Sequence, residues 1–415
     1  MESVVKLNFF SYTLTMKCFN SAKKIVQTLQ NSGFIAYFAG GWVRDYLLGK
    51  DPYDIDIATT ATPDEIMNLF PKTIPVGINF SILIVVQDDE QHEVATFRAE
   101  EEHLDGRRPS KILHVSPEED AKRRDFTING MFYDPLTDTV YDYVGGKDDL
   151  KKGIIRAVGN PHIRFKEDRL RMIRACRYSA RFFFPIEENT FQAILSHASE
   201  LFPAVAIERV YDEFNKMTKD PHLFDALLLM HKCNLLEVIF KNLPLISYEK
   251  LYKKLHNLPK FPKNTYPSLY MYELFEKLSL EQKLNLCLNF KVSKAEMNFT
   301  QELNKWDNSM EYTDYQLAKL YANPLADRHL EIASIYKNDS AFATFHKKKQ
   351  HLLSSHVKRL QANTLLVTAA DLIALGMEKG KGLGNALQKA EELCINHNCS
   401  SKEEVIALLN LLQNP

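Results

Sequence analysis

Two neighbouring segments are the most informative about the fold: Ile35–Asp45, IAYFAGGWVRD, and, after a short gap, Asp54–Ala58, DIDIA. The apolar start of the first segment ends at a Gly-Gly pair, which favours a short buried strand followed by one or two helical turns. The second segment alternates acidic and apolar residues, as a strand with one buried face does. Asp54 and Asp56 are therefore expected on the same face of that strand.

The two carboxylates of this strand indicate a site for Mg²⁺ and a phosphate. Like charges so close repel each other unless a divalent cation lies between them, and Mg²⁺ binds one or two carboxylates together with substrate phosphates. Gly40 and Gly41 lie between a strand and a helix start, where backbone N–H groups can approach a phosphate, and Arg44 adds a guanidinium fork. Acid-x-acid pairs alone are uninformative, since about 7 are expected by chance in this composition. Glu93, on a later predicted strand, is either a third acid of the site or a solvent-exposed glutamate.

The patterns around this stretch predict a mixed α/β region. Thr62-Pro63-Asp64-Glu65 combines an N-cap Thr, a Pro at the first helical position and a Glu three residues after the cap, which marks a helix start. The other expected segments are a helix over Lys17–Asn31, hairpin strands over Phe80–Gln87 and His92–Arg98 with a loop over 88–91, a charged irregular loop over 100–117, and a loose extension before Met16.

From Gly159 onward, 3.6-residue periodicity dominates, and prolines at 244, 259, 262 and 267 mark loops between helices. The sequence therefore predicts an α/β head followed by an all-α remainder. Hydrophobic residues make up 45% of the 415 residues, which excludes a mostly disordered chain.

The charges are segregated along the chain. The net charge of −1 argues at first against a nucleic-acid partner, which usually attracts a basic excess. Residues 1–158, however, hold 18 basic and 24 acidic residues, whereas the rest holds 34 and 29. Gly159–Arg181 alone has seven basic and two acidic residues. The basic excess of the second part is thus concentrated in one predicted helical segment.

The cysteines and the hydropathy of the sequence predict a protein of the cytosol. The six cysteines form no CxxC pair and are too sparse for a disulfide framework or a zinc site, which favours a reducing cytosol. No run of about 18 apolar residues occurs, and the first ten residues lack a sustained apolar core, so neither a membrane span nor a signal peptide is expected. The sequence leaves the oligomeric state open.

Two further constellations follow. Arg124, Asp125 and Asn129 lie in the run RRDFTIN, where arginine forks precede possible partners for ribose hydroxyls; a surface ion-pair cluster is the alternative. Arg171, Arg174 and Arg177 recur every three residues after Asp168. Residues at this spacing are neighbours on a helix surface, so the three arginines form a row that winds gradually around the helix. Such a stripe is often a solvated face, but an Asp with an Arg also offers an acceptor and donors for a nucleobase edge.

These motifs, in this order, resemble those of class II tRNA nucleotidyltransferases, the CCA-adding enzymes and their poly(A) polymerase relatives. The resemblance covers residues 40–213 and includes IERV at Ile207–Val210. A further likeness lies downstream at Asp371–Gly376 with Gly382 and Gly384, which resembles the tail segment of the CCA-adding branch. It implies an α+β head with a DNA polymerase β-like nucleotidyltransferase palm, followed by an all-α neck, body and tail. The expected boundaries are 1–158 for the head, 159–230 for the neck with the nucleobase-template helix, 231–350 for the body and 351–415 for a tRNA-binding tail.

The resemblance also implies roles for individual residues. The expected substrates are a tRNA 3′ end with CTP and ATP, and the expected cofactor is Mg²⁺ in a two-metal nucleotidyl transfer. Asp168 and Arg171 match the amino-acid template that pairs with the base of CTP or ATP. Asp54 and Asp56 match the metal carboxylates, with Glu93 as a possible third catalytic acid. The remaining nucleotide-binding positions are Gly41, Arg44, Arg124, Asp125, Asn129, Arg174 and Arg177, and Glu208 with Arg209 match a motif that supports the template helix.

Departures from the family pattern leave the matched functional positions intact. Arg169 stands where the family usually has Pro, and Gly130 where it commonly has Ala. The loop Asp105–Pro109 resembles one linked to switching from C to A addition, and Gly77–Ser81 lacks a Gly-Arg-Arg-Phe run of bacterial poly(A) polymerases. The expected activity is CCA addition; an A-adding enzyme, a poly(A) polymerase, or a catalytically silent RNA-binding module remains the alternative.

Overall fold

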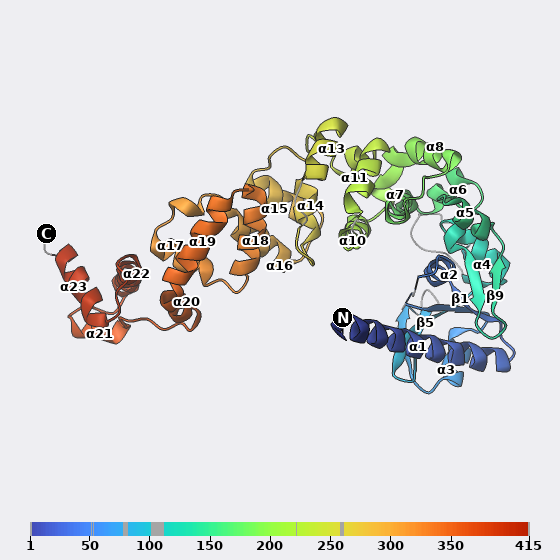
Figure 1. Cartoon of the computed structure of the whole chain (residues 1–415), viewed down its shortest axis with the longest axis horizontal. Coiled ribbons are helices and arrows are strands. Elements are labelled where there is room, and N and C mark those ends of the chain that lie inside the picture. The colour runs from blue at the N-terminus through green and yellow to red at the C-terminus, as the bar shows by residue number, and fades with distance from the viewer. Residues whose placement is uncertain are drawn as a thin grey trace. The chain divides into compact units, whose positions relative to one another are not determined.

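The computed structural model describes residues 2–50, 52, 54–77, 82–100, 112–220, 222–257 and 261–413 (Figure 1). The chain divides into two compact units, Met1–His256 and Asn257–Pro415. All described strands belong to the first unit, and the second contains helices. The expected α+β head followed by an all-helical remainder is confirmed, whereas the head, neck, body and tail boundaries stay predictions.

The first unit is built around a mixed sheet. Among the described residues, seven strands form it in the order β3-β4-β5-β2-β1-β8-β9, and β6 and β7 form a separate pair. β2 and β5 run parallel, while the other neighbours are antiparallel. The strands are β1 Ala36–Ala39, β2 Asp56–Thr59, β3 Thr73–Gly77, β4 Ile82–Gln87, β5 Glu90–Thr96, β6 Arg98–Glu100, β7 Ile112–His114, β8 Met131–Asp134 and β9 Thr139–Asp142.

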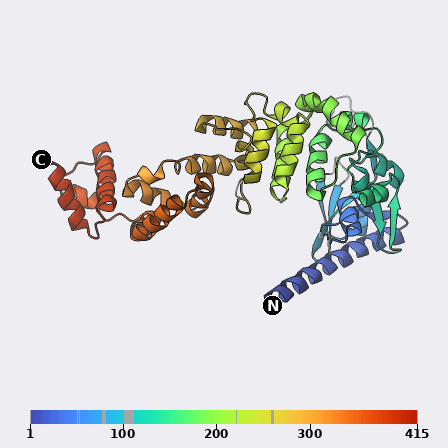
Figure 2. The ribbon, with the colours of Figure 1, turned by 45° about the horizontal axis from the view of Figure 1, so that its top comes forward.

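The strand register places the acidic residues on one face of the sheet. Asp56 of β2 lies opposite Ala39 of β1, so the two side chains share a face. Val94 of β5 pairs with Ile57, which puts Glu93 on the face opposite Ile57 and therefore on the Asp56 face. The other face is covered by helix α1, which contacts β1, β2, β4 and β5 (Figures 1 and 2).

Helices precede, interrupt and follow this sheet. Those of the first unit are α1 Glu2–Asn31, α2 Gly41–Leu47, α3 Pro63–Leu69, α4 Pro117–Arg123, η2 Thr127–Asn129, α5 Gly146–Lys152, α6 Pro161–Glu167, α7 Leu170–Phe182, α8 Glu188–His197, η3 Ala198–Glu200, α9 Leu201–Ala204, α10 Ile207–Thr218, α11 Leu223–Lys232 and α12 Leu235–Ile239, with α13 Tyr248–Asn257 at the boundary.

The second unit has cores of its own. One forms around Trp306, Leu317 and Phe342, and another around Leu372 and Val405. Its helices are α14 Pro267–Tyr272, α15 Leu280–Asn289, α16 Lys294–Asn304, η4 Ser309–Glu311, α17 Asp314–Tyr321, α18 Ala326–Lys337, α19 Ser340–Leu352, α20 Ser354–Gln361, α21 Ala369–Ala374, α22 Lys381–Asn396 and α23 Lys402–Gln413.

Local expectations hold with a few corrections. The Thr62 capping box at the start of α3 is present, with Thr62 and Glu65 bonded reciprocally. The expected loose extension before Met16 is wrong: α1 begins at Glu2, and the sequence from there to Asn31 contains no Gly or Pro to interrupt it. The hairpin turn is shorter than expected, because Asp88 and Asp89 both adopt positive φ and β5 already begins at Glu90.

Candidate active site

A cavity of about 610 Å³ opens in the first unit where the sheet meets α7 and α10. Its lining is strongly polar, with six basic and five acidic side chains. Segments that lie far apart in sequence supply it: the β1–α2 turn, β2, the α4–η2 segment, the α6–α7 corner and α10. The lining residues are Gly40, Gly41, Asp56, Arg123, Arg124, Asp125, Asn129, Asp168, Leu170, Arg171, Arg174, Tyr178, Arg209, Asp212, Glu213 and Lys216.

Asp56 lies at the acidic wall of this cavity. Loss of surrounding water, together with the negative charges of Asp54 and Glu93, raises the pKa of Asp56 to about 6, although Arg124 acts in the opposite direction. The carboxylates thus repel one another, and a bound cation would relieve that repulsion. Across the described residues, no three His, Cys, Asp or Glu side chains come together as a metal-binding group. The two-carboxylate pattern of Asp54 and Asp56 still fits Mg²⁺, which completes its shell with phosphate oxygens and water.

Gly40 makes room for an arginine beside this wall. Its φ of 67° is disfavoured for residues with a side chain, and a Cβ built there would lie 2.9 Å from Nη1 of Arg124. Arg124 is held by the buried Asp120, which accepts from its Nε at 3.1 Å, and it packs over the ring of Phe132. Gly40, Asp120 and Phe132 therefore fix where the Arg124 guanidinium lies.

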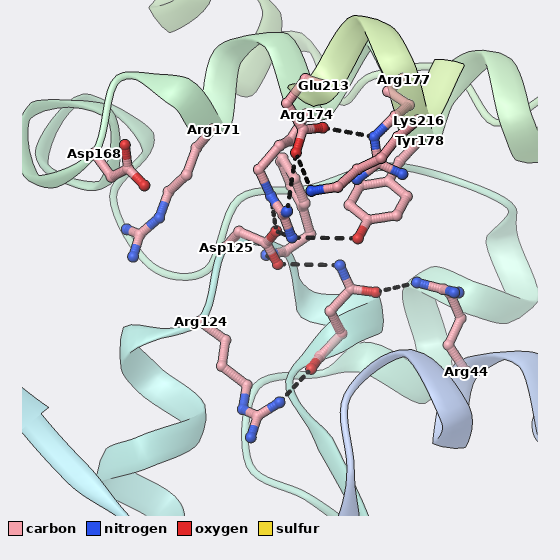
Figure 3. Close-up of polar contacts among 12 residues, drawn as sticks. Arg44, Arg124, Asp125, Asp168, Arg171, Arg174, Arg177, Tyr178, Glu213 and Lys216 are labelled. Carbon is pink, nitrogen blue, oxygen red and sulfur yellow. Dashed lines mark hydrogen bonds and ion pairs between the residues drawn. The ribbon is translucent and has the colours of Figure 1, made fainter. Parts of the chain in front are cut away.

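A chain of hydrogen bonds connects α2 to α7. Arg44 is 3% exposed, pairs with Asp45 through two bonds of 2.9 Å, and donates to Oδ1 of Asn129. Asn129 donates to Oδ1 of Asp125 at 3.0 Å, and Arg174 donates to Oδ2 at 2.8 and 2.6 Å (Figure 3). The structure thus places Arg44 behind the cavity, where it orients Asn129.

Asp125 is the ionised centre of that chain. Burial alone would raise its pKa, but Arg174, Asn129 and the backbone N–H of Phe126 outweigh burial and lower the pKa to about 2. Its two oxygens together accept four hydrogen bonds, which is the capacity of a carboxylate. Asp125 is therefore saturated by protein donors and holds Arg174 in place.

Glu213 of α10 gathers three cations. Its carboxylate is 1% exposed and lies 2.7 Å from Nε of Arg177, 2.8 Å from Nζ of Lys216 and 3.6 Å from Nη1 of Arg174 (Figure 3). Burial alone would raise the pKa of Glu213, yet the arginines and Lys216 lower it. Arg177 also stacks over the ring of Tyr178, at 4.2 Å from its centroid. Arg177 thus supports the cavity from behind.

Asp168 and Arg171 lie together at the start of α7 and line the cavity. Asp168 accepts from Arg209 of α10 at 3.2 and 2.8 Å and from the N–H of Leu170 at 3.1 Å. Arg171 donates to Glu167 at 2.8 Å and to the carbonyl oxygen of Arg123 at 2.9 Å. Within the described part of the chain, Nε of Arg171 donates to no acceptor, so this pair retains capacity for a ligand.

The structure brings most of the sequence-predicted site residues to one cavity. Asp56, Gly41, Arg124, Asp125, Asn129, Asp168, Arg171 and Arg174 line it. Asp54 and Glu93 act on Asp56 through charge without lining the cavity, and Arg44 and Arg177 lie behind it. Asp371 is engaged elsewhere, in the capping box of α21. The Asp105–Pro109 loop and part of Gly77–Ser81 lie outside the described residues.

Sequence reasoning missed several contributors. Glu213, Asp212, Lys216 and Tyr178 line the cavity, and Asp120 holds both Arg123 and Arg124. The spacing of Glu213 four residues after Arg209 is a detectable signal, because the two side chains then share a helix face. Asp120 lies three and four residues before Arg123 and Arg124, and this spacing is a signal of the same kind. Over the described residues, no helix has the length and apolar character to cross a membrane.

Family models match two parts of the chain. Residues 36–156 match the "Poly A polymerase head domain", and residues 183–246 match the "Probable RNA and SrmB-binding site of polymerase A". The first match contains the acidic strand and the RRDFTIN run, and the second contains α10.

Individual relatives extend the similarity over nearly the whole chain. The chain is 33% identical over 393 residues to a CCA-adding enzyme of Lactobacillus helveticus, which covers 94% of this chain and 96% of the relative. It is 45% identical over 206 residues to the CCA-adding enzyme of Staphylococcus saprophyticus, a match that spans 49% of this chain and 51% of that one. The crystal structure of the Bacillus stearothermophilus CCA-adding enzyme in complex with CTP superposes with a TM-score of 0.69 at 27% identity, covering 95% of this chain and 98% of that one.

Proposed function

Because the chain belongs to the family of CCA-adding enzymes, we propose that it is a tRNA nucleotidyltransferase that adds C, C and A to tRNA 3′ ends from CTP and ATP, releasing pyrophosphate. The observation that carries the proposal is the single cavity in which Asp56, four arginines and the Asp168–Arg171 pair meet. Such a cavity offers a wall for a metal and phosphates and, at the α6–α7 corner, an edge for a base.

The cavity is suited to distinguishing C and A from the other bases. Cytosine and adenine both present an exocyclic amino group, whereas uracil and guanine present a carbonyl oxygen at the corresponding position. The Asp168 carboxylate can accept from an amino group but repels a carbonyl oxygen. Arg171, with its unused Nε–H, can donate to the ring nitrogen beside that amino group. We propose that this pair reads the base.

The remaining residues would hold the triphosphate and the reacting hydroxyl. Arg124 is the best placed cation at the acidic wall, since Asp120 and Gly40 fix it beside Asp56. Asn129 and Asp125 orient Arg44 and Arg174 and thereby shape the wall. Asp54 and Asp56 would bind Mg²⁺, which when bound supplies Lewis-acid activation and charge neutralisation for phosphoryl transfer. Glu93 lies on the same sheet face and adds negative charge there.

Incubation of the full-length protein with tRNA lacking CCA, Mg²⁺ and either CTP or ATP tests the proposal. We expect C to be incorporated from CTP alone, and A only after two C residues. Incorporation of A without C would instead establish the A-adding or poly(A) activity. Asp56→Asn should abolish incorporation, because it removes a carboxylate that the cation needs, whereas Asp148→Asn, an exposed acid outside the cavity, should leave the rate unchanged.

We also propose a cytoplasmic location. The six cysteines all lie in the described part of the chain, where they are buried and none is joined in a disulfide, as is usual for proteins of a reducing compartment.

A further inference from the structure

Two consecutive residues at the α6–α7 corner point in different directions. Asp168 lines the cavity, whereas Arg169 is not among its lining residues and reaches instead to η3. Nη2 of Arg169 donates to Oε2 of Glu200 at 3.1 Å, and Nη1 donates to the carbonyl oxygen of Lys166 at 3.3 Å. The backbone that carries the Asp168 carboxylate is thus tied on its other side to a separate element.

Glu200 also contacts His197, which in turn contacts His162. Nδ1 of His197, at the end of α8, lies 3.1 Å from Oε1 of Glu200, so both oxygens of Glu200 are used. Nε2 of His197 lies 3.1 Å from Nδ1 of His162 on α6, and the two rings meet edge to face. Arg169, Glu200, His197 and His162 therefore form one polar chain that links α6, the end of α8, η3 and the start of α7.

Asp168 and Arg169 form the junction between α6 and α7, where contacts from other elements are needed to fix the backbone. Asp168 ends α6 with φ −146° and ψ 104°, outside the helical region, and Arg169 precedes the first residue of α7. The Asp168 N–H donates to the carbonyl oxygen of Arg164 at 3.4 Å, and the Asp168 carbonyl oxygen accepts from the N–H of Arg171 at 3.1 Å, so this peptide carries only the terminal bonds of two helices. Its carboxylate accepts from Arg209 and from the N–H of Leu170. Arg209 holds the carboxylate from the α10 side, and Arg169 holds the adjacent backbone from the η3 side.

We propose that Arg169, through Glu200, is a positioning residue that sets the Asp168 carboxylate for reading the base. This inference rests on the proposed function, in which Asp168 and Arg171 select C and A. The Arg169–Glu200 pair is partly exposed, with 22% and 41% of the two side chains accessible, so it contributes little to folding stability. Its loss acts mainly on the geometry of the neighbouring residue.

Arg169→Ala in the full-length protein tests the inference, with tRNA lacking CCA as the acceptor. We expect KM for CTP and ATP to rise. The preference for CTP over UTP, measured as the ratio of the two kcat/KM values, should fall about 10-fold. The reason is that a displacement of the Asp168 carboxylate by less than an ångström costs about that factor in rate. The rate at saturating CTP should change less. Arg169→Lys, which keeps a cation within reach of Glu200, should restore most of the preference.

Two further variants separate positioning from general damage. Glu200→Gln should lower the CTP preference as Arg169→Ala does, and the double variant should be no worse than either, because both changes break one link. Arg156→Ala removes an ion pair with Asp149 and Glu187 at 3.0 and 3.3 Å that touches neither Asp168 nor the cavity, and it should leave the preference unchanged.

The outcomes are distinguishable. If the unaltered protein incorporates C while Arg169→Ala keeps the CTP preference of Arg156→Ala, the positioning role is wrong and the proposed function stands. An additive double variant would likewise contradict a single link. If the unaltered protein incorporates no C, the proposed function fails and the role of Arg169 fails with it.

Discussion

At the scale of single residues, the candidate site depends on residues that position other residues. Asp120 fixes two arginines, and Asp125 uses all its acceptor capacity on protein donors. Gly40 contributes by lacking a side chain, because the space that a Cβ would take is occupied by Arg124. The positions of the arginines at the cavity wall therefore depend on these neighbouring residues.

Gly40→Ala is expected to reduce kcat/KM for nucleotide incorporation by at least about 10-fold, since it displaces Arg124, for which we propose a phosphate-binding role that stabilises the transition state. The alanine must also adopt a φ of 67°, which costs about 1–3 kcal/mol of stability. Steady-state kinetics and urea denaturation measure the two effects.

Gly49→Ala is the matched control, because Gly49 has a φ of 68° and no atom lies within 4 Å of the position that its Cβ would take. It shares the positive φ but not the contact with Arg124. Equal kinetic losses in the two variants would show that backbone strain, not Arg124, accounts for the effect.

At the scale of elements, α7 and α10 act as one structure. The three-residue spacing of Arg171, Arg174 and Arg177 places them on α7, but each makes its shortest contact with a different partner, although Arg174 also lies 3.6 Å from Glu213. Arg171 donates to the carboxylate of Glu167 and to the carbonyl oxygen of Arg123. Arg174 donates to Asp125, and Arg177 donates to Glu213. Glu213 of α10 is thus the counter-charge that allows the arginines to lie close together.

Glu213→Gln keeps the shape of the side chain and removes its charge. We expect a loss of about 3 kcal/mol in the unfolding free energy of the first unit, because buried cations are left uncompensated. Glu302→Gln, which breaks an exposed pair with Lys305, should cost less than about 1 kcal/mol. Urea denaturation at pH 7 measures both, and similar losses in the two variants would contradict the role of Glu213.

At the scale of the whole molecule, each compact unit carries its own core and its own tryptophan. Trp42 packs in the first unit against Phe38, and Trp306 lies at the centre of the second unit beside His346. His346 is fully buried and lies 2.9 Å from the Ser309 hydroxyl and 2.8 Å from the Tyr321 hydroxyl. Burial lowers the pKa of His346 to about 4, and it lowers that of His329 to about 4 as well.

These shifts predict that the second unit loses stability in acid. A histidine whose folded pKa is depressed contributes fully above its unfolded value near 6.5 and loses that contribution as pH falls toward 4. For His346 the loss is about 3 kcal/mol between pH 7 and pH 4. Trp306 fluorescence during urea denaturation of a Trp42→Phe variant measures it, and His346→Gln should flatten the pH dependence. An unchanged pH dependence in that variant would assign the loss to other groups.

Local sequence patterns are sufficient to identify the secondary structure around the site and the family. Alternation in Asp54–Ala58, the capping box at Thr62 and the periodicity after Gly159 are local patterns, because a strand or helix exposes and buries residues at a fixed spacing. The motif order from Gly40 to Val210 was sufficient to indicate the nucleotidyltransferase chemistry. The net charge of −1 argues against a nucleic-acid partner, but the concentration of basic residues in Gly159–Arg181 removes that objection.

Which charged side chains line the cavity and which pair with one another depends on contacts between distant elements of the fold. Arg44 and Arg174 look equivalent in sequence, yet one is buried against Asp45 and the other lines the cavity. Glu213 acquires its role from arginines of another helix, α7, and Arg169 from a glutamate 31 residues away. The physical reason is that a buried charge is stabilised by whichever opposite charge the fold brings within a few ångströms, and sequence separation does not encode that distance.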